Sequence, residues 1–136
     1  MSAIAFSRGV RISPRKVSVV ASLVRGRTVS DALTILQHTP RRPAEVLRKT
    51  VLSAKANAEH NHNYKPDSLY ISQIAVTAGP RFRRYRAAAR GRALRYARKT
   101  SHIKVVVDGH QRESQKKSAE KSATKPVVKA QVKGDK

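Results

Sequence analysis

The sequence predicts one mixed domain of helices and strands, a long β-hairpin that projects from it, and a basic C-terminal tail. Three observations lead to this expectation. Three segments with helical periodicity follow one strand-like segment and precede two more. An arginine-rich stretch, residues 81–99, lies between the last two strand-like runs, and the composition changes to Lys, Ser, Ala and Gln after Val107. A chain of 136 residues has room for a single hydrophobic core.

The N-terminal segment has the alternation of a half-buried strand. Ile4, Phe6, Val10 and Ile12 fall on one parity, and small or polar residues fall on the other. This period of two predicts a strand whose apolar face carries those four side chains. Arg8 interrupts the apolar row.

Two short helices follow. Ser13 is expected to be the N-cap of the first, with Pro14 at its first position, and Gly26 is expected to take the left-handed conformation at its C-terminal end. The second helix is expected to begin with Ser30 as its cap. It ends before Pro40, because the residue that precedes a proline avoids the helical region.

A third helix and two strands complete the domain. The helix begins near Pro43 and ends within residues 61–63, and residues 69–78 and 102–107 are rich in β-formers. The two strands are expected to pair antiparallel, which makes the stretch between them the arm of a hairpin. The apolar stripe of the helix comprises Ala44, Leu47, Val51, Ala54 and Ala58.

The charge balance indicates the class of partner. The chain has 30 basic and 8 acidic residues, a formal net charge of +22, and nucleic acid is the usual partner of such a protein. A membrane surface is the alternative, but the sequence has no 18-residue apolar run. The absence of cysteine excludes disulfides, thiolate zinc sites and cysteine nucleophiles. No secretory signal is apparent at the N-terminus.

The basic stretch itself favours nucleic-acid binding. Nine cations and no acidic residue lie between Arg81 and Lys99, and eight of the nine are arginines, which bind phosphate bidentately. Phe82, Tyr85 and Tyr96 are interleaved with them and suit stacking on unpaired bases. A solvated loop is the alternative interpretation. An isolated hairpin is marginal in water and this one has little to bury, so we expect a partner to support it.

Other candidate chemistries are weaker. Arg15 and Lys16 lie in the first turn of a helix, where free amides and two cations suit an anion, although both side chains can equally well point into solvent. Glu59, His60 and His62 are interpreted as polar residues at a helix end, because positions two apart do not share a helix face. No acid and base pair, nucleophile motif or phosphate loop is present. We therefore expect no enzyme activity, no cofactor and no metal.

Several motifs together resemble one known family. They are ISPRKVSVVASLVRGRTVSDALTIL, AEVLRKTVLSAKANAEHNHN, the GP of Gly79 and Pro80, ARGRA at 89–93, and KTSHIKVVV from Lys99. In this order they resemble the bacterial-type large-subunit ribosomal protein L twenty-two family over about residues 3–107. The resemblance implies an α+β fold, with three helices packed on a three-stranded antiparallel sheet.

The resemblance also implies a place in the cell. Residues 1–107 would form a single ribosomal RNA-binding domain that includes the hairpin 77–103, with a tail at 108–136 whose composition predicts disorder. The hairpin would line the nascent-polypeptide exit tunnel, and the protein would support assembly of the large subunit. Its partners would be large-subunit ribosomal RNA, neighbouring ribosomal proteins and the nascent chain, without a membrane or a second copy. The ribosome would be that of the bacterial cytoplasm or of an organelle.

Two sets of site residues follow from the resemblance and the charge pattern. The tip would face the tunnel, and it departs from the family at Ala87 and Ala88, where relatives often have proline and arginine. The tip set is Arg86, Ala87, Ala88, Ala89, Arg90, Gly91 and Arg92. The RNA-binding set is Arg8, Arg11, Arg15, Lys16, Arg25, Arg81, Arg83, Arg84, Arg86, Arg90, Arg92, Arg95, Arg98, Lys99 and His102. The competing alternative is a free DNA architectural protein or RNA chaperone.

Overall fold

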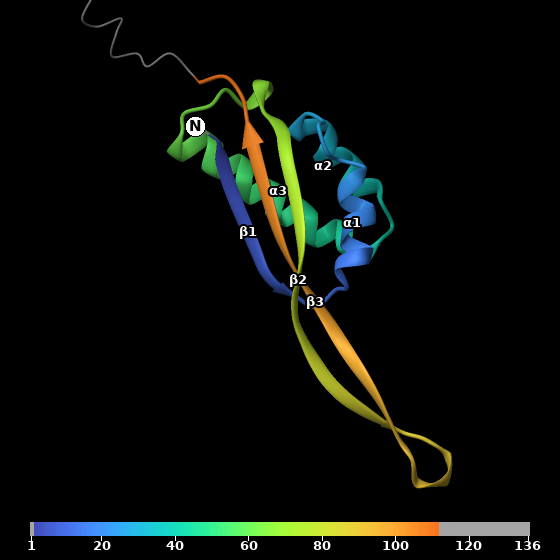
Figure 1. Cartoon of the computed structure of the whole chain (residues 1–136). Helices are drawn as coiled ribbons and strands as arrows, with labels where there is room; N and C mark the ends of the chain where they lie inside the picture. The colour runs from blue at the N-terminus through green and yellow to red at the C-terminus, as the bar shows by residue number, and fades with distance from the viewer. Residues whose placement is uncertain (1, 112–136) are drawn as a thin grey trace, which may run out of the picture.

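A computed structural model describes residues 2–111 of the chain, which form an α+β domain with a long projecting hairpin (Figure 1). From residue 112 onward, the predicted tail lies outside the described residues. The elements are β1 (Ala3–Val10), α1 (Pro14–Ser22), α2 (Val29–His38), α3 (Arg42–Asn61), a one-turn 3-10 helix (Pro66–Ser68), β2 (Tyr70–Ala87) and β3 (Ala93–Asp108).

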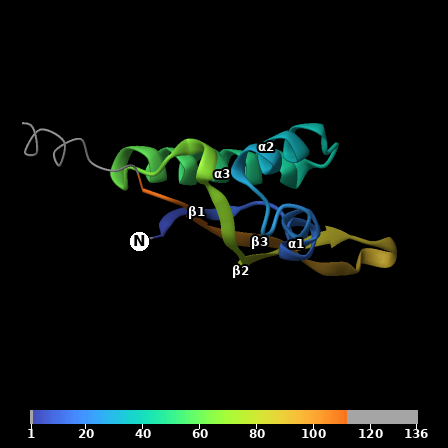
Figure 2. The same ribbon diagram turned by 90° about the horizontal axis from the view of Figure 1, so that it is seen from above.

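The three strands form one antiparallel sheet in the order β1-β3-β2, so the last strand of the domain is the central one. Figure 2 shows α2 and α3 together over one face of this sheet. The predicted fold class, three helices on a three-stranded antiparallel sheet with a protruding hairpin, is confirmed. Within residues 2–111, no helix is long and apolar enough to cross a membrane.

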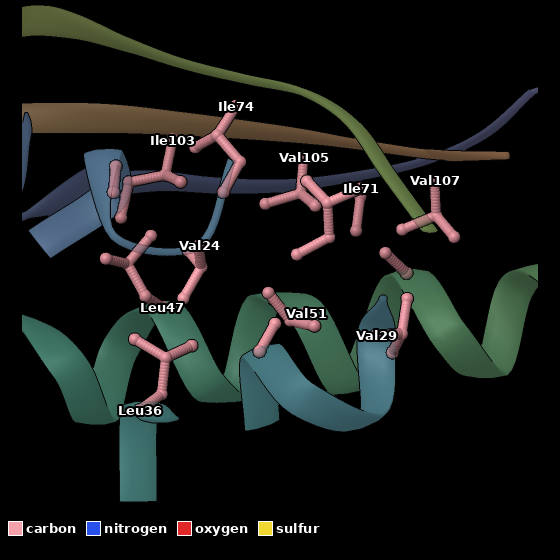
Figure 3. Close-up of a cluster of buried hydrophobic side chains, with 14 of the residues drawn as sticks. Val24, Val29, Leu36, Leu47, Val51, Ile71, Ile74, Ile103, Val105 and Val107 are labelled. Carbon is pink, nitrogen blue, oxygen red and sulfur yellow. The ribbon is translucent and has the colours of Figure 1, made fainter. Parts of the chain in front are cut away.

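The core lies between the sheet and the helices (Figure 3). Alternate residues of β3 point into it, because successive side chains of a strand face opposite sides of the sheet. The buried side chains that Figure 3 labels on the strands are Ile71, Ile74, Ile103, Val105 and Val107, and those on the helical side are Val24, Val29, Leu36, Leu47 and Val51.

The predicted apolar face of β1 is wrong for Ile4 and Phe6, whereas Val10 and Ile12, which follow a register shift after Ser7, are partly buried against the core. Ala3 and Ala5 are the buried residues of this strand, whereas Ile4 is 38% exposed and Phe6 is 58% exposed. The side chains of Ile4 and Phe6 therefore lie on the sheet face that the helices leave uncovered.

The position of α3 explains this reversal. The side-chain amide of Asn57 donates to the carbonyl oxygen of Ile4 over 3.0 Å, so α3 passes close to β1. The residues that α3 buries here include Ala54 and Ala58. Small side chains on both elements let the helix and the strand approach closely, and larger side chains on the inner face of β1 would push them apart.

The first helix begins after Ser13 as predicted, although the Ser13 side chain makes no cap hydrogen bond. It ends at Ser22, so the prediction that Gly26 directly terminates it is wrong. Gly26 does adopt a left-handed conformation, with φ of +72°, within the following loop. Its N–H donates to the carbonyl oxygen of Ile71 over 3.1 Å, which ties that loop to β2.

The second helix is capped two residues earlier than predicted, by Thr28 instead of Ser30. The Thr28 hydroxyl accepts a hydrogen bond from the N–H of Asp31 over 3.3 Å. Thr28 forms an antiparallel bridge with Tyr70, so it is still extended when the helix begins at the next residue. The contact with β2, which no local pattern predicts, selects this hydroxyl as the cap.

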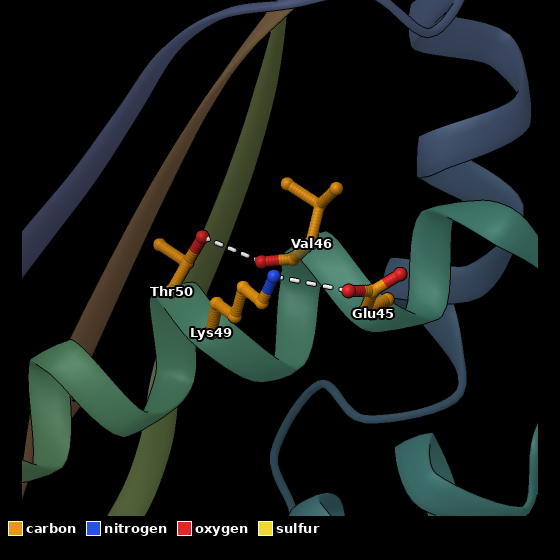
Figure 4. A network of polar contacts seen from close by, with 4 residues as sticks. All are labelled: Glu45, Val46, Lys49 and Thr50. Carbon is orange, nitrogen blue, oxygen red and sulfur yellow. Dashed lines mark hydrogen bonds and ion pairs between the residues drawn. The ribbon is translucent and has the colours of Figure 1, made fainter.

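The third helix has the predicted limits, and polar contacts join neighbouring turns in its first half (Figure 4). The buried Thr50 hydroxyl donates to the carbonyl oxygen of Val46 over 2.9 Å, so its burial leaves no unpaired donor. Lys49 lies 3.0 Å from Glu45 on the exposed side. Hydrogen bonding to Lys49 lowers the pKa of the Glu45 carboxyl from its usual value of 4.5.

Candidate nucleic-acid interface

The most exposed part of the molecule is the arm, which we define as residues 81–99 (Figure 1). Its strands are the continuations of β2 and β3, paired from Arg81 opposite Lys99 to Ala87 opposite Ala93. Seven rungs at about 3.3 Å each make this ladder about 23 Å long. Nearly every side chain of the arm is exposed to solvent.

The register divides the arm into two faces, because directly opposed residues of an antiparallel pair project to the same side. One face, which we call the aromatic face, carries Phe82, Arg84, Arg86, Leu94, Tyr96 and Arg98. The other, which we call the alanine face, carries Arg81, Arg83, Tyr85, Ala87, Ala93, Arg95, Ala97 and Lys99. Both faces therefore present several cations, but only the first presents more than one large apolar side chain.

Arginines lie over the tyrosine rings of the arm. The Arg86 guanidinium carbon is 5.9 Å from the centroid of the Tyr96 ring, and that of Arg95 is 5.8 Å from the centroid of the Tyr85 ring. Such cation–π contacts at exposed sites contribute about 0.5–1 kcal/mol each. They hold the guanidinium groups beside the rings without neutralising their charge.

The tip of the arm is a tight turn. The N–H of Ala88 donates to the carbonyl oxygen of Arg92 over 2.8 Å and closes the loop. Inside it, Arg90 has φ of +60° and Gly91 has φ of +68°. A left-handed conformation is costly for a residue with a side chain, so the turn holds the Arg90 guanidinium at the far end of the molecule at some cost in strain.

A bulge at Gly79 and Pro80 joins the arm to the sheet, and the pairing shifts there between Ala78 and Arg81. The buried Thr100 hydroxyl donates to the carbonyl oxygen of Pro80 over 2.7 Å. A Cβ atom at Gly79 would lie 2.5 Å from the Thr100 Oγ1, which leaves no room for a side chain. Bulges of this kind bend a strand and set the direction in which it leaves the sheet.

A pocket of about 140 Å³ lies at this junction, and the helical turn at the start of α1 forms one of its walls. Three cations from three elements surround it: Arg15 from α1, Arg81 from β2 and Lys99 from β3. The hydroxyl of Ser13 makes no cap hydrogen bond. The complete lining is Ser13, Pro14, Arg15, Ala78, Gly79, Arg81, Lys99 and Thr100. We call it the basic pocket; its chemistry suits an anion such as a phosphate group.

The cations of the arm and of the basic pocket have no internal counter-charge. Within residues 2–111, the ion pairs are Glu45 with Lys49 at 3.0 Å and Glu59 with Lys55 at 3.7 Å, both on α3. The arm contains no acidic residue. An anionic partner would therefore meet this surface without having to break an existing ion pair.

Arg8, another residue of the predicted RNA-binding set, lies on the face of the sheet that the helices leave open. The Arg8 guanidinium lies 5.6 Å from the centroid of the Phe6 ring, and the ammonium group of Lys104 lies 5.7 Å from it. Sequence reasoning missed Phe6 and Lys104 as surface residues, since Phe6 was assigned to the apolar face of its strand. Arg8 interrupts the row of apolar residues on that face, and this interruption was the feature of the sequence that indicated an exposed face.

Four other residues of the predicted RNA-binding set lie outside the basic pocket. Arg25 donates to the carbonyl oxygen of Ile74 over 3.1 Å and helps to hold the loop after α1. The Nδ1 atom of His102 accepts a hydrogen bond from the N–H of Gly9 over 3.0 Å. Arg11, in the loop before α1, and Lys16, in the first turn of α1, are exposed. Thus the structure brings Arg15, Arg81 and Lys99 together, but not Arg25.

In the described part of the chain, no group of three His, Asp or Glu side chains could hold a metal ion. Glu59 pairs with Lys55, and the His62 ring lies 6.1 Å from the ring of Tyr64, centroid to centroid. Both residues belong to the polar end of α3.

Comparison with known proteins identifies relatives. Residues 5–108 match the model of the family described as ribosomal protein L22p/L17e. The large ribosomal subunit protein uL22 of Herpetosiphon aurantiacus is 47% identical over 108 residues, which cover 79% of this chain and 96% of that relative. The proteins of the same name from Clostridioides difficile and Oceanobacillus iheyensis are 48% and 49% identical over 107 residues, 79% of this chain and 96% and 95% of theirs.

Proposed function

The chain belongs to the ribosomal protein L22p/L17e family, a family of structural constituents of the large ribosomal subunit, and we propose that it binds large-subunit ribosomal RNA through its arm and its basic pocket. The observation that carries this proposal is the arm itself. It presents nine cations, no acidic residue and almost no buried surface.

An anionic partner would compensate the positive charge that the arm concentrates. An exposed two-stranded ladder adds little to the stability of the domain, and its concentrated charge repels itself. A polyanion removes that repulsion, and arginine pairs with phosphate in a bidentate geometry. Ribosomal RNA is the polyanion that a constituent of the large subunit meets.

We further propose that the arm extends into the subunit and that residues 86–92 line the nascent-polypeptide exit tunnel. The support is the resemblance of the motifs to the family together with the narrow, projecting shape of the arm (Figure 1). The three alanines at 87–89 let the turn lie close to a wall formed by other components. Neighbouring large-subunit proteins and the nascent chain are the partners expected there, and the arm would help to order RNA during assembly.

Sedimentation tests the ribosomal role. A lysate of the source cells is separated on a sucrose gradient after a wash at moderate salt, and the protein is quantified in each fraction. We expect about one copy in each large subunit. A protein found only at the top of the gradient would contradict the proposal and favour a free nucleic-acid-binding protein.

Crosslinking tests the position of the tip. A photoreactive amino acid replaces Arg90 in one variant and the exposed Lys49 of α3 in a control variant, and each is incorporated into ribosomes that carry a stalled nascent chain. We expect a crosslink to the nascent chain from position 90 and none from position 49. Crosslinks from position 90 to RNA alone would refute the tunnel location and leave RNA binding intact.

A further inference from the structure

We propose that the two faces of the arm bind different parts of RNA: the aromatic face stacks on unpaired bases, and the alanine face lies along a phosphate backbone. This inference rests on the proposed binding of RNA and adds which chemical group each face takes. It follows from the register of the ladder, which decides which side chains share a face.

The aromatic face has a regular composition. Each of its three rungs opposes one apolar side chain with one arginine: Phe82 with Arg98, Tyr96 with Arg84, and Leu94 with Arg86. An apolar ring next to a cation is suited to a nucleotide, whose base is a flat apolar surface and whose phosphate is an anion.

The two rings of this face are suitably placed for a base. Phe82 and Tyr96 are diagonal neighbours, because Tyr96 is directly opposite Arg84. Diagonal neighbours are about 7–8 Å apart. Stacked planes are separated by about 3.4 Å, so one base fits between the two rings with a stacking distance to each of them. Phe82 is 46% exposed and Tyr96 is 49% exposed, so about half of each ring is open to a partner.

The alanine face has a different chemistry. It has four cations, one ring at Tyr85 and three alanines, so no second ring is available to hold a base against the first. The alanines allow a partner to approach the strand backbone, and the cations lie between the Ala87–Ala93 rung and the domain. Arg81 and Lys99 of this face also line the basic pocket beside Arg15, so the phosphate-binding chemistry continues to the base of the arm.

Charge selects RNA over protein as the partner of the aromatic face. Every rung of that face carries an arginine, and the arm has no acidic residue. A protein partner would have to supply an acidic patch and a hydrophobic one within the same three rungs. A single-stranded segment of RNA supplies phosphates and bases alternately along its whole length.

The test separates bases from phosphates. The full-length protein is titrated at fixed salt with a 20-residue oligoadenylate and with an abasic ribose-phosphate oligomer of the same length. The double variant Phe82→Leu with Tyr96→Leu is expected to lose about five- to hundredfold in affinity for oligoadenylate, because loss of one stacked base has effects of this size. Its affinity for the abasic oligomer is expected to stay within twofold of the wild type.

Three comparison variants sharpen the test. Tyr85→Leu removes a ring from the opposite face and is expected to lose less affinity for oligoadenylate than either Phe82→Leu or Tyr96→Leu alone. Phe82→Tyr keeps a ring and is expected to bind nearly as well as the wild type. Arg83→Ala with Arg95→Ala, on the alanine face, is expected to weaken binding of both oligomers by the same factor.

A spectroscopic signal checks the geometry directly. Fluorine NMR of the protein labelled with 3-fluorotyrosine, with signals assigned by the leucine variants, reports on Tyr85 and Tyr96 separately. We expect oligoadenylate to shift the Tyr96 signal more than that of Tyr85, and the abasic oligomer to shift neither strongly.

Two results would overturn the division of the faces. One is an equal loss of oligoadenylate affinity from Tyr85→Leu and Tyr96→Leu. The other is no loss from the double variant, which would favour a protein partner for the aromatic face. Either result leaves the sedimentation experiment unaffected, so failure of this inference is distinguishable from failure of the proposed ribosomal role.

Discussion

The two halves of β3 have almost the same length and opposite surroundings. In the domain, Ile103, Val105 and Val107 are almost completely buried beneath the helices. In the arm, every residue from Ala93 to Lys99 is exposed. The same strand is therefore part of the hydrophobic core at one end and a binding surface at the other.

This difference separates stability from recognition. Burial of apolar surface holds the domain together, whereas the arm buries little and is rich in charge. Changes in the domain should therefore alter the free energy of unfolding, and changes in the arm should alter binding. Substitutions in each region test that separation.

A matched pair of leucines gives the most direct test. Leu47 is completely buried, and Leu94 on the arm is 60% exposed. Leu47→Ala is expected to lower the free energy of unfolding by about 2–5 kcal/mol, because it removes buried methyl groups and leaves a cavity. Leu94→Ala is expected to change it by less than about 0.5 kcal/mol. Urea unfolding followed by circular dichroism measures both values.

The separation fails if Leu94→Ala destabilises the protein as much as Leu47→Ala does. Such a result would mean that the arm packs against the domain or is coupled to it during unfolding.

The bulge is where the two regions meet, and Gly79→Ala tests it. The new Cβ would lie 2.5 Å from the Thr100 hydroxyl, which is buried and bonded to Pro80. We expect a loss of about 1–3 kcal/mol, since the backbone or Thr100 must move. Thermal unfolding measures this loss.

A double-mutant cycle supplies the control for this prediction. In a Thr100→Ala background the clashing oxygen is absent, so Gly79→Ala is expected to cost less than it does in the wild type. Equal costs in the two backgrounds would show that the clash is not the cause.

The basic pocket should contribute to binding and not to folding. We expect Arg15→Ala with Lys99→Ala to reduce the slope of log affinity against log salt by about two for a ribosomal RNA fragment, because each cation contributes about one phosphate contact. Lys49→Ala with Lys55→Ala removes the same charge from residues that already pair with glutamates. An equal change of slope in this control would argue against a localised pocket.

The smallest expected effect concerns pH and the end of the domain opposite the arm. Burial raises the pKa of the Tyr64 phenol above its usual value of 10.0, and the nearby Asp108 carboxylate raises it further. The contribution of Tyr64 to stability is therefore complete below pH 10 and is lost as the pH rises through the higher pKa of the folded state. Tyr64→Phe should remove this part of the alkaline loss of stability. Unfolding measured between pH 9 and 11 compares the two proteins, and identical pH dependence would contradict the assignment.

The helices and the position of the arm were predictable because they depend on local signals. The proline at position 14 marks the start of α1, and the change from periodic to basic sequence marks the arm. The inner face of β1 was not predictable in this way. Its alanines are buried because α3 lies close above them, and the distance between two elements is a property of the whole fold.

The division of the arm into faces was also out of reach. The paired residues 81–87 and 93–99 are all exposed to solvent, so no hydrophobic pattern fixes the register of its strands. The register follows instead from the bulge at Gly79 and Pro80, where the pairing shifts. The basic pocket was missed as a unit for a similar reason, since Arg15 is far in sequence from Arg81 and Lys99. The antiparallel pairing of β2 and β3 brings Arg81 and Lys99 together, and the position of α1 adds Arg15.

The continuity of the arm with the central strand has a mechanical consequence. β3 pairs with β1 on one side and with β2 on the other. A pull on the tip acts on β2 and β3 together, because both strands form the arm. It therefore loads the ladder between β3 and β1 in shear, where the hydrogen bonds resist together. This architecture lets a slender projection withstand tension while the domain to which it is anchored keeps its shape.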